Sequence, residues 1–240
     1  MKKRIEGLYF GRNILREALE AEVEISEIYY DTDAAFEFIN SLKGVKTFGA
    51  RLVKGLPAII KNQAHQGVAF WTPHTFYRPL RDYPLNKQRF VILCNHVQDI
   101  HNFGSIVRCA VAFGAGLLIH EEKGSAELTA AAMKSSAGLA FRLSFCKVEH
   151  LSEATRALAK NGFRIIGLDA GNNAQVLRDW IPQFPLALVL GSEGEGISVG
   201  IKKYCESLVS IPMERAAESL NVSHAAAIAM NWVYEGGQGG

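Results

Sequence analysis

The sequence lacks several features that would assign a function class at once. Its four cysteines stand far apart, with no C-x-x-C pair and no His/Cys cluster at zinc spacing. No apolar run reaches the roughly 20 residues that a membrane helix needs. The basic start, Met1 to Arg4, leads into Glu6 and not into the apolar core of a signal peptide. We therefore expect a cytoplasmic protein with free thiols, no metal site and no membrane contact.

Acidic residues are missing from a long stretch of the N-terminal third. None occurs between Glu37 and Asp82, and this stretch holds seven basic residues. A surface of this kind attracts a polyanion, although a solvated basic face is the simpler alternative. The aromatic residues within the stretch are more simply explained as core. We predict that RNA binds there, at Lys43, Lys46, Arg51 and Lys54.

The spacing of apolar residues predicts two α/β domains. In residues 1–72 it indicates helices near 11–21, 33–42 and 51–62, and strands near 25–31, 45–48 and 66–71. Residues 73–88 hold three prolines and little periodicity, which is typical of a linker. Residues 89–240 begin with the buried-strand pattern RFVILCN. Further strands are expected near 116–120, 143–148, 163–168, 186–190 and 207–211, with helices near 102–114, 126–138, 151–161, 198–206 and 220–234. This alternation predicts a mostly parallel sheet.

Polar residues and a glycine follow the first strand of the second domain, in the segment DIHNFGSIVR at 99–108. Ligand sites in parallel sheets lie beyond the carboxyl ends of strands. Asn102 is a candidate helix cap, and Arg108 lies six residues further on. We expect both to project toward the start of the helix on one side. An arginine among apolar residues needs an anion or acceptors for its donors, although a cap and a surface arginine would also explain the pair.

Two later segments carry similar signals. The run LVLGSEGEG at 188–196 is a strand that enters a turn with three glycines and two glutamates. Its glycine order is not that of a dinucleotide fold, and its two glutamates would repel a pyrophosphate. We therefore expect the backbone of this loop to approach an uncharged or cationic ligand. A plain tight turn is the alternative, and the three glycines and two acids make it the weaker one. The third segment is ESLNVSHAAAIA at 218–229, which begins with Ser219, Asn221 and Ser223. Helix capping explains one of these three polar residues but not all of them.

These three segments, in this order and spacing, resemble the motifs of the SpoU (TrmH-type) ribose 2′-O-methyltransferases of the SPOUT class. The resemblance runs from about residue 88 to 235. The stretch from IEGLYFGRNILREAL to HQGVAF also resembles the substrate-binding domain that precedes the catalytic domain in the ribosomal-RNA branch. One departure is YFGRN at 9–13, where those relatives commonly have tyrosine-glycine-x-histidine.

The resemblance implies a fold, a cofactor and a site. The fold is a C-terminal SPOUT α/β domain with a trefoil knot over 89–240, preceded by an L7Ae/L30e-like α/β domain over 1–72. The cofactor is S-adenosylmethionine, lined by Gly191, Ile211 and Leu220. The resemblance carries over Arg108 as the catalytic residue, with Asn102, Glu193, Ser219 and Asn221 around it. It also implies a homodimer whose active sites draw on both subunits, and it favours ribosomal RNA over transfer RNA.

Two alternatives stay open from the residues alone. A dinucleotide-dependent oxidoreductase is disfavoured by the glycine order and the acids of the turn. A non-catalytic RNA-binding module would use residues 1–72 and leave the polar motif residues unexplained. The proton acceptor is also open, because a guanidinium stays protonated and Arg108 is therefore a poor general base. It would instead bind the phosphate beside the target ribose, and that phosphate could accept the proton.

Overall fold

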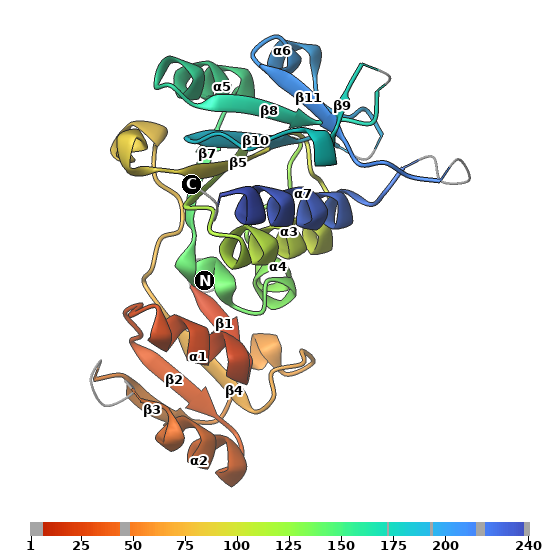
Figure 1. The fold of residues 1–240 in the computed structure, drawn as a ribbon. Helices are drawn as coiled ribbons and strands as arrows, with labels where there is room; N and C mark the ends of the chain where they lie inside the picture. The colour runs from red at the N-terminus through yellow and green to blue at the C-terminus, as the bar shows by residue number, and fades with distance from the viewer. Residues whose placement is uncertain (1–6, 44–48, 172, 193, 215–218, 238–240) are drawn as a thin grey trace. The chain divides into compact units, whose positions relative to one another are not determined.

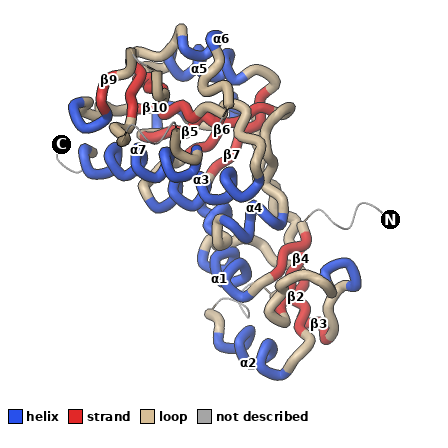
Figure 2. Tube along the Cα trace, turned by 90° about the vertical axis from the view of Figure 1, so that its right-hand side faces the viewer, coloured by secondary structure: helices blue, strands red, loops and turns tan. Residues whose placement is uncertain are grey.

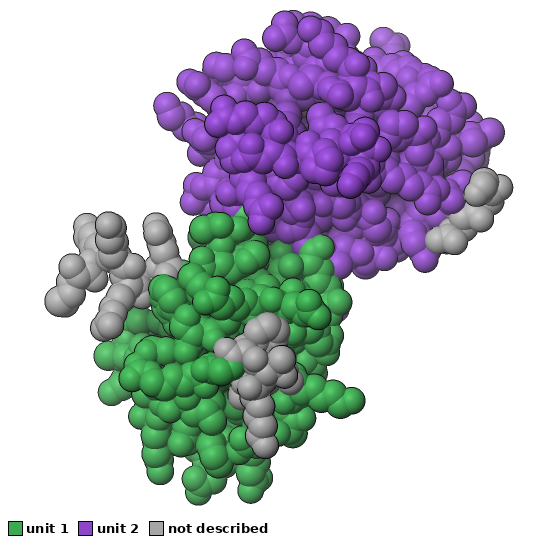
Figure 3. Space-filling view, turned by 90° about the vertical axis from the view of Figure 1, so that its left-hand side faces the viewer, with its two compact units in different colours: residues 1–76, 128–142 green, residues 77–127, 143–240 purple. Residues whose placement is uncertain are grey.

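The computed structural model describes residues 7–43, 49–171, 173–192, 194–214 and 219–237. They divide into two compact units, coloured separately in Figure 3. The first holds residues 1–76 with 128–142, and the second holds 77–127 with 143–240. Residues 128–142, which the sequence assigns to the C-terminal domain, thus group with the N-terminal part of the chain. Whether each unit is an independent domain stays a prediction.

The first unit is a small mixed sheet with helices. Its four strands run in the order β1-β4-β2-β3, and only β2 and β3 are parallel. The elements are β1 (Leu8–Phe10), α1 (Arg12–Glu20), β2 (Glu27–Tyr30), α2 (Asp33–Ser41), β3 (Arg51–Lys54), the 3₁₀ turn η2 (Ala58–Ile60), β4 (Val68–Trp71), α4 (Ala130–Ser135) and the 3₁₀ turn η5 (Leu139–Arg142). Its core includes packed rings of Tyr9, Phe70, Phe76 and Phe141. Of the aromatic residues between Glu37 and Asp82, buried Phe70 and half-buried Phe76 belong to this packing, as the sequence favoured.

One predicted helix of this unit is wrong. Residues 51–62 form strand β3 and the 3₁₀ turn η2 instead of a helix. Gly55, with φ of 101°, and Pro57 interrupt any helix that starts at Arg51. The backbone of residues 51–54 then pairs with β2. The strand predicted near 45–48 lies outside the described residues, because 44–48 are not among them.

The second unit contains a seven-stranded sheet in which every neighbouring pair is parallel. The strand order is β7-β6-β5-β10-β8-β11-β9. The elements are the 3₁₀ turns η3 (Leu80–Asp82) and η4 (Leu85–Lys87), β5 (Phe90–Cys94), α3 (Ile100–Ala112), β6 (Leu117–Glu121), β7 (Ser144–Val148), α5 (Leu151–Lys160), β8 (Arg164–Leu168), β9 (Gln175–Val176), the 3₁₀ turn η6 (Leu177–Asp179), β10 (Leu186–Leu190), α6 (Val199–Lys202), β11 (Ser207–Ser210) and α7 (Val222–Gly236). The predicted parallel α/β sheet is confirmed.

Helices cover both faces of this sheet. Figure 1 shows α5 and α6 on one face and α3 and α7 on the other, and Figure 2 also has α3 and α7 side by side. All five residues of β5 and of β10 are buried, because their alternate side chains enter the two helix layers. On the α5 side the core includes Leu93, Leu117, Leu158 and Val189. Among the described residues, no helix is both long and apolar enough to cross a membrane.

Within the first unit, residues 128–142 pack closely against α1, and Gly138 tests this packing. Gly138 has φ of 88°, and a Cβ placed on it would lie 3.0 Å from the Cα of Ile14 and 3.0 Å from the Cβ of Glu17. We expect Gly138→Ala to destabilise the protein through both backbone strain and overpacking, the latter costing about 1–3 kcal/mol. The measurement is the free energy of unfolding in urea.

Gly162→Ala is the matched control. Gly162 has a similar φ of 83° but no neighbouring heavy atom within 4 Å of the added Cβ. Gly162→Ala should therefore lose only the free energy of unfolding that the backbone strain costs, about 1–2 kcal/mol. Equal losses in the two variants would contradict the close packing of residues 128–142 on α1.

Candidate functional site

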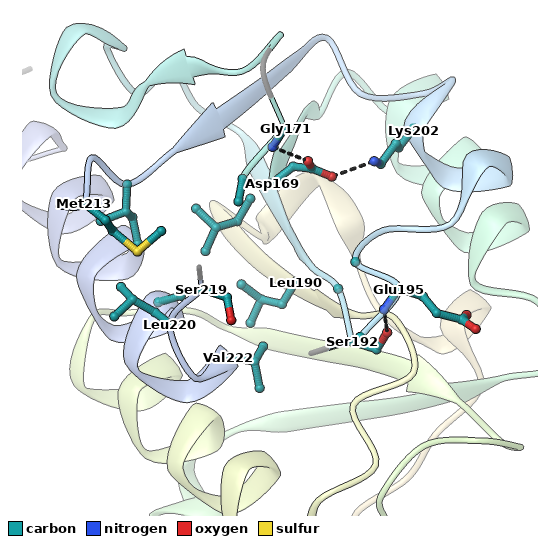
Figure 4. Close-up of a pocket in the computed structure, with 17 residues that line it drawn as sticks. Asp169, Gly171, Leu190, Ser192, Glu195, Lys202, Met213, Ser219, Leu220 and Val222 are labelled. Carbon is teal, nitrogen blue, oxygen red and sulfur yellow. Dashed lines mark hydrogen bonds and ion pairs between the residues drawn. The ribbon is translucent and has the colours of Figure 1, made fainter. Parts of the chain in front are cut away.

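The carboxyl ends of β8, β10 and β11 carry the loops that form a cavity of about 300 Å³. Parallel strands place these loops at one edge of the sheet. Apolar side chains line one part of the cavity, and Figure 4 shows Leu190, Met213, Leu220 and Val222 around it. Main-chain atoms of glycines line another part. The size and the mixed lining are typical of a small-molecule site.

The glycine-rich turn after β10 forms one wall of this cavity. Ser192 and Gly196 exchange two backbone hydrogen bonds, of 3.2 and 3.1 Å between N and O, which close the turn. The chain then passes directly against Gly191, where an added Cβ would lie 2.2 Å from the carbonyl carbon of Gly196. Only glycine allows this close approach of two backbone segments. Position 191 therefore requires glycine.

An ion pair beside the glycine-rich turn also lines the cavity, where a Cβ added to Gly196 would lie 3.8 Å from Oδ2 of Asp169. Asp169 follows β8, and its Oδ2 lies 2.6 Å from Nζ of Lys202 on α6. Its Oδ1 accepts a hydrogen bond of 2.8 Å from the backbone N–H of Gly171. Burial raises the pKa of this carboxyl, but the hydrogen bond and charge of Lys202 and the N–H of Gly171 outweigh it and hold the pKa below its ordinary value. Lys202 is the one cationic residue among the described lining residues, so the cavity has an acidic rather than a basic character.

A second cavity, of about 640 Å³, adjoins the first at the end of β5. The two cavities share lining residues from the turn after β10, together with Val222. The polar side chains of Gln98, Asp99 and Asn102 line the second cavity. Its occupant would therefore lie directly beside that of the first cavity.

A hydrogen bond between α3 and α7 brings the first and third motifs together. Nδ2 of Asn221 donates to Oδ1 of Asn102 over 3.0 Å. Asn221 also caps α7, because its Oδ1 accepts from the backbone N–H and the hydroxyl of Ser223 at 2.9 and 2.6 Å. The sequence suggested Asn102 as the cap of α3, but the structure shows that it is not. Asp99 is the cap, since its Oδ1 accepts from the backbone N–H of Asn102 over 2.7 Å.

The structure places the predicted site residues differently from one another. Gly191, Ile211, Leu220 and Ser219 line the first cavity, while Asn102 lines the second. Arg108 is exposed on α3 and lines neither cavity. The expectation that Arg108 and Asn102 project on one side is wrong, since six residues rotate the helix by about 240° from Asn102. Glu193 lies outside the described residues.

The predicted RNA-binding residues are on the first unit. Lys43, Arg51 and Lys54 are exposed, and Lys46 lies outside the described residues. Arg51 forms an ion pair with Glu27 of the neighbouring strand β2, which offsets part of its charge. The sequence did not reveal this pairing, because the two residues are 24 positions apart. Among the described residues, no group of three or more His, Cys, Asp or Glu side chains is placed to hold a metal ion.

Sequence reasoning missed a buried polar cluster beneath the second cavity. Asn95 and Glu121 are almost fully buried at the ends of β5 and β6. Nδ2 of Asn95 donates to Oε1 of Glu121 over 2.8 Å, and Oδ1 of Asn95 accepts from the backbone N–H of Ser198 over 2.8 Å. An asparagine at the end of an apolar strand was the available signal for Asn95. Nothing in the local pattern of Glu121 and Glu122 indicated which of them is buried.

The Asp169–Lys202 pair predicts a pH effect. In Lys202→Met, burial is no longer opposed by the lysine, so we expect the pKa of Asp169 to rise. In the wild type the ionised pair stabilises the folded state when the pH is above the ordinary aspartate pKa. This stabilisation is lost as the pH falls through the lowered pKa of Asp169 in the folded protein. Carboxyl NMR titration of both proteins measures the shift. Lys203→Met is the control, and an unchanged Asp169 titration in Lys202→Met would contradict the assignment.

Comparison with known proteins identifies the family. The sequence profile of the SpoU rRNA methylase family matches residues 89–231. An uncharacterised tRNA/rRNA methyltransferase of Mycobacterium avium is 33% identical over 230 residues, which cover 92% of this chain and 74% of that protein.

Solved structures share the fold over nearly the whole chain. The SpoU methyltransferase AviRb of Streptomyces viridochromogenes, in complex with the cofactor AdoMet, superposes with a TM-score of 0.80 at 23% identity, covering 97% of this chain and 91% of that one. An RNA 2′-O ribose methyltransferase superposes with a TM-score of 0.74 at 20% identity, covering 96% and 88%. With the match of the family profile to more than half of its residues, this chain belongs to the SpoU rRNA methylase family, a family of RNA methyltransferases.

Proposed function

We propose that this protein transfers a methyl group from S-adenosylmethionine to a ribose 2′-hydroxyl of RNA, in ribosomal RNA rather than transfer RNA. Family membership supports methyl transfer to RNA. The observation that carries the proposal is the pair of adjoining cavities. One is lined by Gly191, Ile211 and Leu220, and the other by Asn102, which is bonded to Asn221. A methyl donor and an acceptor ribose could thus meet at a shared boundary.

The first cavity fits S-adenosylmethionine in size and in charge. Apolar side chains from β10 and α7 can hold an adenine ring, and the main chain near Gly191 can hydrogen-bond to its edge. The donor carries a positive sulfonium, and the described lining has acidic side chains at Asp169 and Glu195. Its one lysine is already paired with Asp169. A phosphate-bearing cofactor would find no free cation among these residues.

Transfer of the methyl group depends mainly on position. The bound cofactor supplies an activated methyl group on its sulfonium. The protein must hold the ribose oxygen in line with that methyl and assist the loss of its proton. In our proposal Arg108 binds the phosphate that flanks the target ribose and stabilises the developing negative charge, and the phosphate accepts the proton. Asn102 and Glu193 orient Arg108 or the ribose, and Ser219 and Asn221 hold the cofactor and the motif loops.

The position of Arg108 supports a homodimer with shared active sites. Arg108 is exposed on α3 and lines neither cavity of its own chain. The neighbouring helix α7 leaves Ile228 and Tyr234 each 44% exposed, so apolar surface of this helix is open to a second copy. We propose that this helix pair packs against a second copy, so that Arg108 acts in the partner's site.

Three finer features of the proposal follow the family resemblance. The loops after β8, β10 and β11 form a trefoil knot, which agrees with the close backbone approach at Gly191. The first unit is an RNA-binding domain of the L7Ae/L30e kind. The exposed residues Lys43, Arg51 and Lys54, together with Lys46, contact the phosphates of the RNA.

The first experiment is methyl transfer from tritiated S-adenosylmethionine to separate pools of unmodified 23S, 16S and transfer RNA. We expect label in one ribosomal pool, recovered as 2′-O-methylated nucleotides after digestion. Arg108→Ala should reduce kcat/KM by about 10²-fold or more, because it removes charge stabilisation from the transition state. Its affinity for the cofactor, measured by calorimetry, should be unchanged.

Arg156→Ala is the matched control, because Arg156 is exposed on α5, on the opposite face of the sheet. Absence of cofactor binding by the wild type would contradict the methyltransferase proposal and favour an RNA-binding module. Label only in transfer RNA would contradict the choice of substrate. A neutral pKa in the pH–rate profile that disappears in His101→Ala would assign the proton to that histidine instead of the phosphate.

Mixing two inactive variants tests the shared active site. Arg108→Ala lacks the arginine, and Gly191→Ala displaces the glycine-rich turn that lines the cofactor cavity. If Arg108 acts in the partner's site, half of the randomly mixed dimers are heterodimers with one intact site, so activity should return to about a quarter of the wild-type rate. The two variants are unfolded together, refolded together and assayed. No recovery, with heterodimers shown by native mass spectrometry, would contradict action across the dimer.

A further inference from the structure

The second cavity has an aromatic side chain on its wall, at His96. This residue follows β5, and its side chain is 46% exposed. Its backbone has φ of 55°, the left-handed region that residues other than glycine seldom adopt. Such strain persists only where surrounding contacts hold it, and it is concentrated at ligand sites. The conformation of His96 therefore needs a structural cause.

Buried Glu121 supplies that cause. Its Oε2 accepts from the backbone N–H of His96 over 3.1 Å and from the hydroxyl of Ser125 over 3.2 Å. Its Oε1 accepts from Asn95 over 2.8 Å. A carboxylate with only 6% of its surface exposed is costly to bury unless such donors surround it. Glu121 thus fixes the turn that carries His96, and Asn95 connects this turn to Ser198 after β10.

Gly124 leaves room for the imidazole ring. A Cβ added to Gly124 would lie 3.0 Å from Nδ1 and 3.5 Å from Cε1 of His96. The ring therefore lies against the backbone of Gly124, which also lines the cavity. Glu121 thus contacts the backbone of His96 and lies 4.0 Å from Nε2 of its ring, measured to Oε1, while Gly124 lies beside the ring.

We propose that the second cavity binds the base of the target nucleotide, and that this base stacks on His96. The inference deepens the proposed function and rests on it. A ribose beside the cofactor cavity must direct its base to one side, and this cavity adjoins the cofactor cavity through Ser192 and Val222. Proteins that read single-stranded RNA stack splayed bases on aromatic rings, histidine included, and bond to the base edges. Gln98 and Asp99 line the same cavity and supply polar groups for such an edge.

The test measures base contacts independently of methyl transfer. The protein is saturated with S-adenosylhomocysteine, so that no nucleotide can enter the cofactor cavity. Saturation-transfer NMR is then recorded with AMP, GMP, CMP and UMP in turn. We expect transfer to the base protons of at least one nucleotide in the wild type. It should be lost in His96→Ala and kept in His96→Phe, which retains an aromatic face.

Kinetics on the RNA pool labelled by the wild type provide the second measurement. His96→Ala should lower kcat/KM by roughly tenfold, as expected from the loss of one stacked base, while His96→Phe restores most of it. His150→Ala is the control, because His150 is exposed before α5 and lines neither cavity. The affinity for S-adenosylhomocysteine should be equal in all four proteins.

The outcomes separate the two proposals. Failure of the wild type to bind S-adenosylhomocysteine would overturn the proposed function. Binding of S-adenosylhomocysteine with no base contact for any nucleotide would overturn this inference alone. The inference also fails if His96→Phe lowers the base contact and kcat/KM as much as His96→Ala does. It fails as well if His96→Ala weakens S-adenosylhomocysteine binding, since the role of His96 would then be structural.

Discussion

Burial of both faces of a parallel sheet is the constraint on which the rest of the second unit depends. The apolar strands β5 and β10 have no polar face, so helices must cover each side. Because the strands are parallel and in register, the loops after β5, β8, β10 and β11 all leave at one edge. Both cavities form there. The chemistry of the site is therefore confined to a few short loops whose positions the sheet fixes.

The charges around these loops are arranged in an uncommon way for an RNA-binding protein. Carboxylates line or underlie both cavities, with Asp169 held by Lys202 and Glu121 by hydrogen-bond donors. Apart from Lys202, which is paired with Asp169, the basic residues named for RNA contact lie elsewhere, on the exposed part of α3 and on the first unit. An acidic cavity favours a cationic methyl donor, whereas the phosphates of the RNA need the more distant cations. The proposed dimer would reconcile these demands, because Arg108 of one copy would face the cavities of the other.

Much of the fold could be predicted because its signals are local. The buried runs of β5 and β10 gave elements close to those observed. The prediction failed where pairing decided the conformation. Residues 51–54 are exposed or half-buried and have no strong strand pattern, yet β2 offers them a parallel partner. The sequence places residues 128–142 in the second domain. Their packing against α1 instead comes from contacts between residues more than 100 positions apart in the sequence.

By itself, the sequence determined the parallel α/β unit, the three polar motifs and the resemblance to SpoU methyltransferases, because runs of apolar residues and glycine positions are properties of neighbouring residues. Only the tertiary structure decided which polar residues meet. It bonds Asn221 to Asn102 across 119 positions, buries Glu121 and leaves Glu122 exposed, and leaves Arg108 outside both cavities of its own chain. These outcomes depend on how helices and loops pack at one edge of the sheet, which no local pattern specifies.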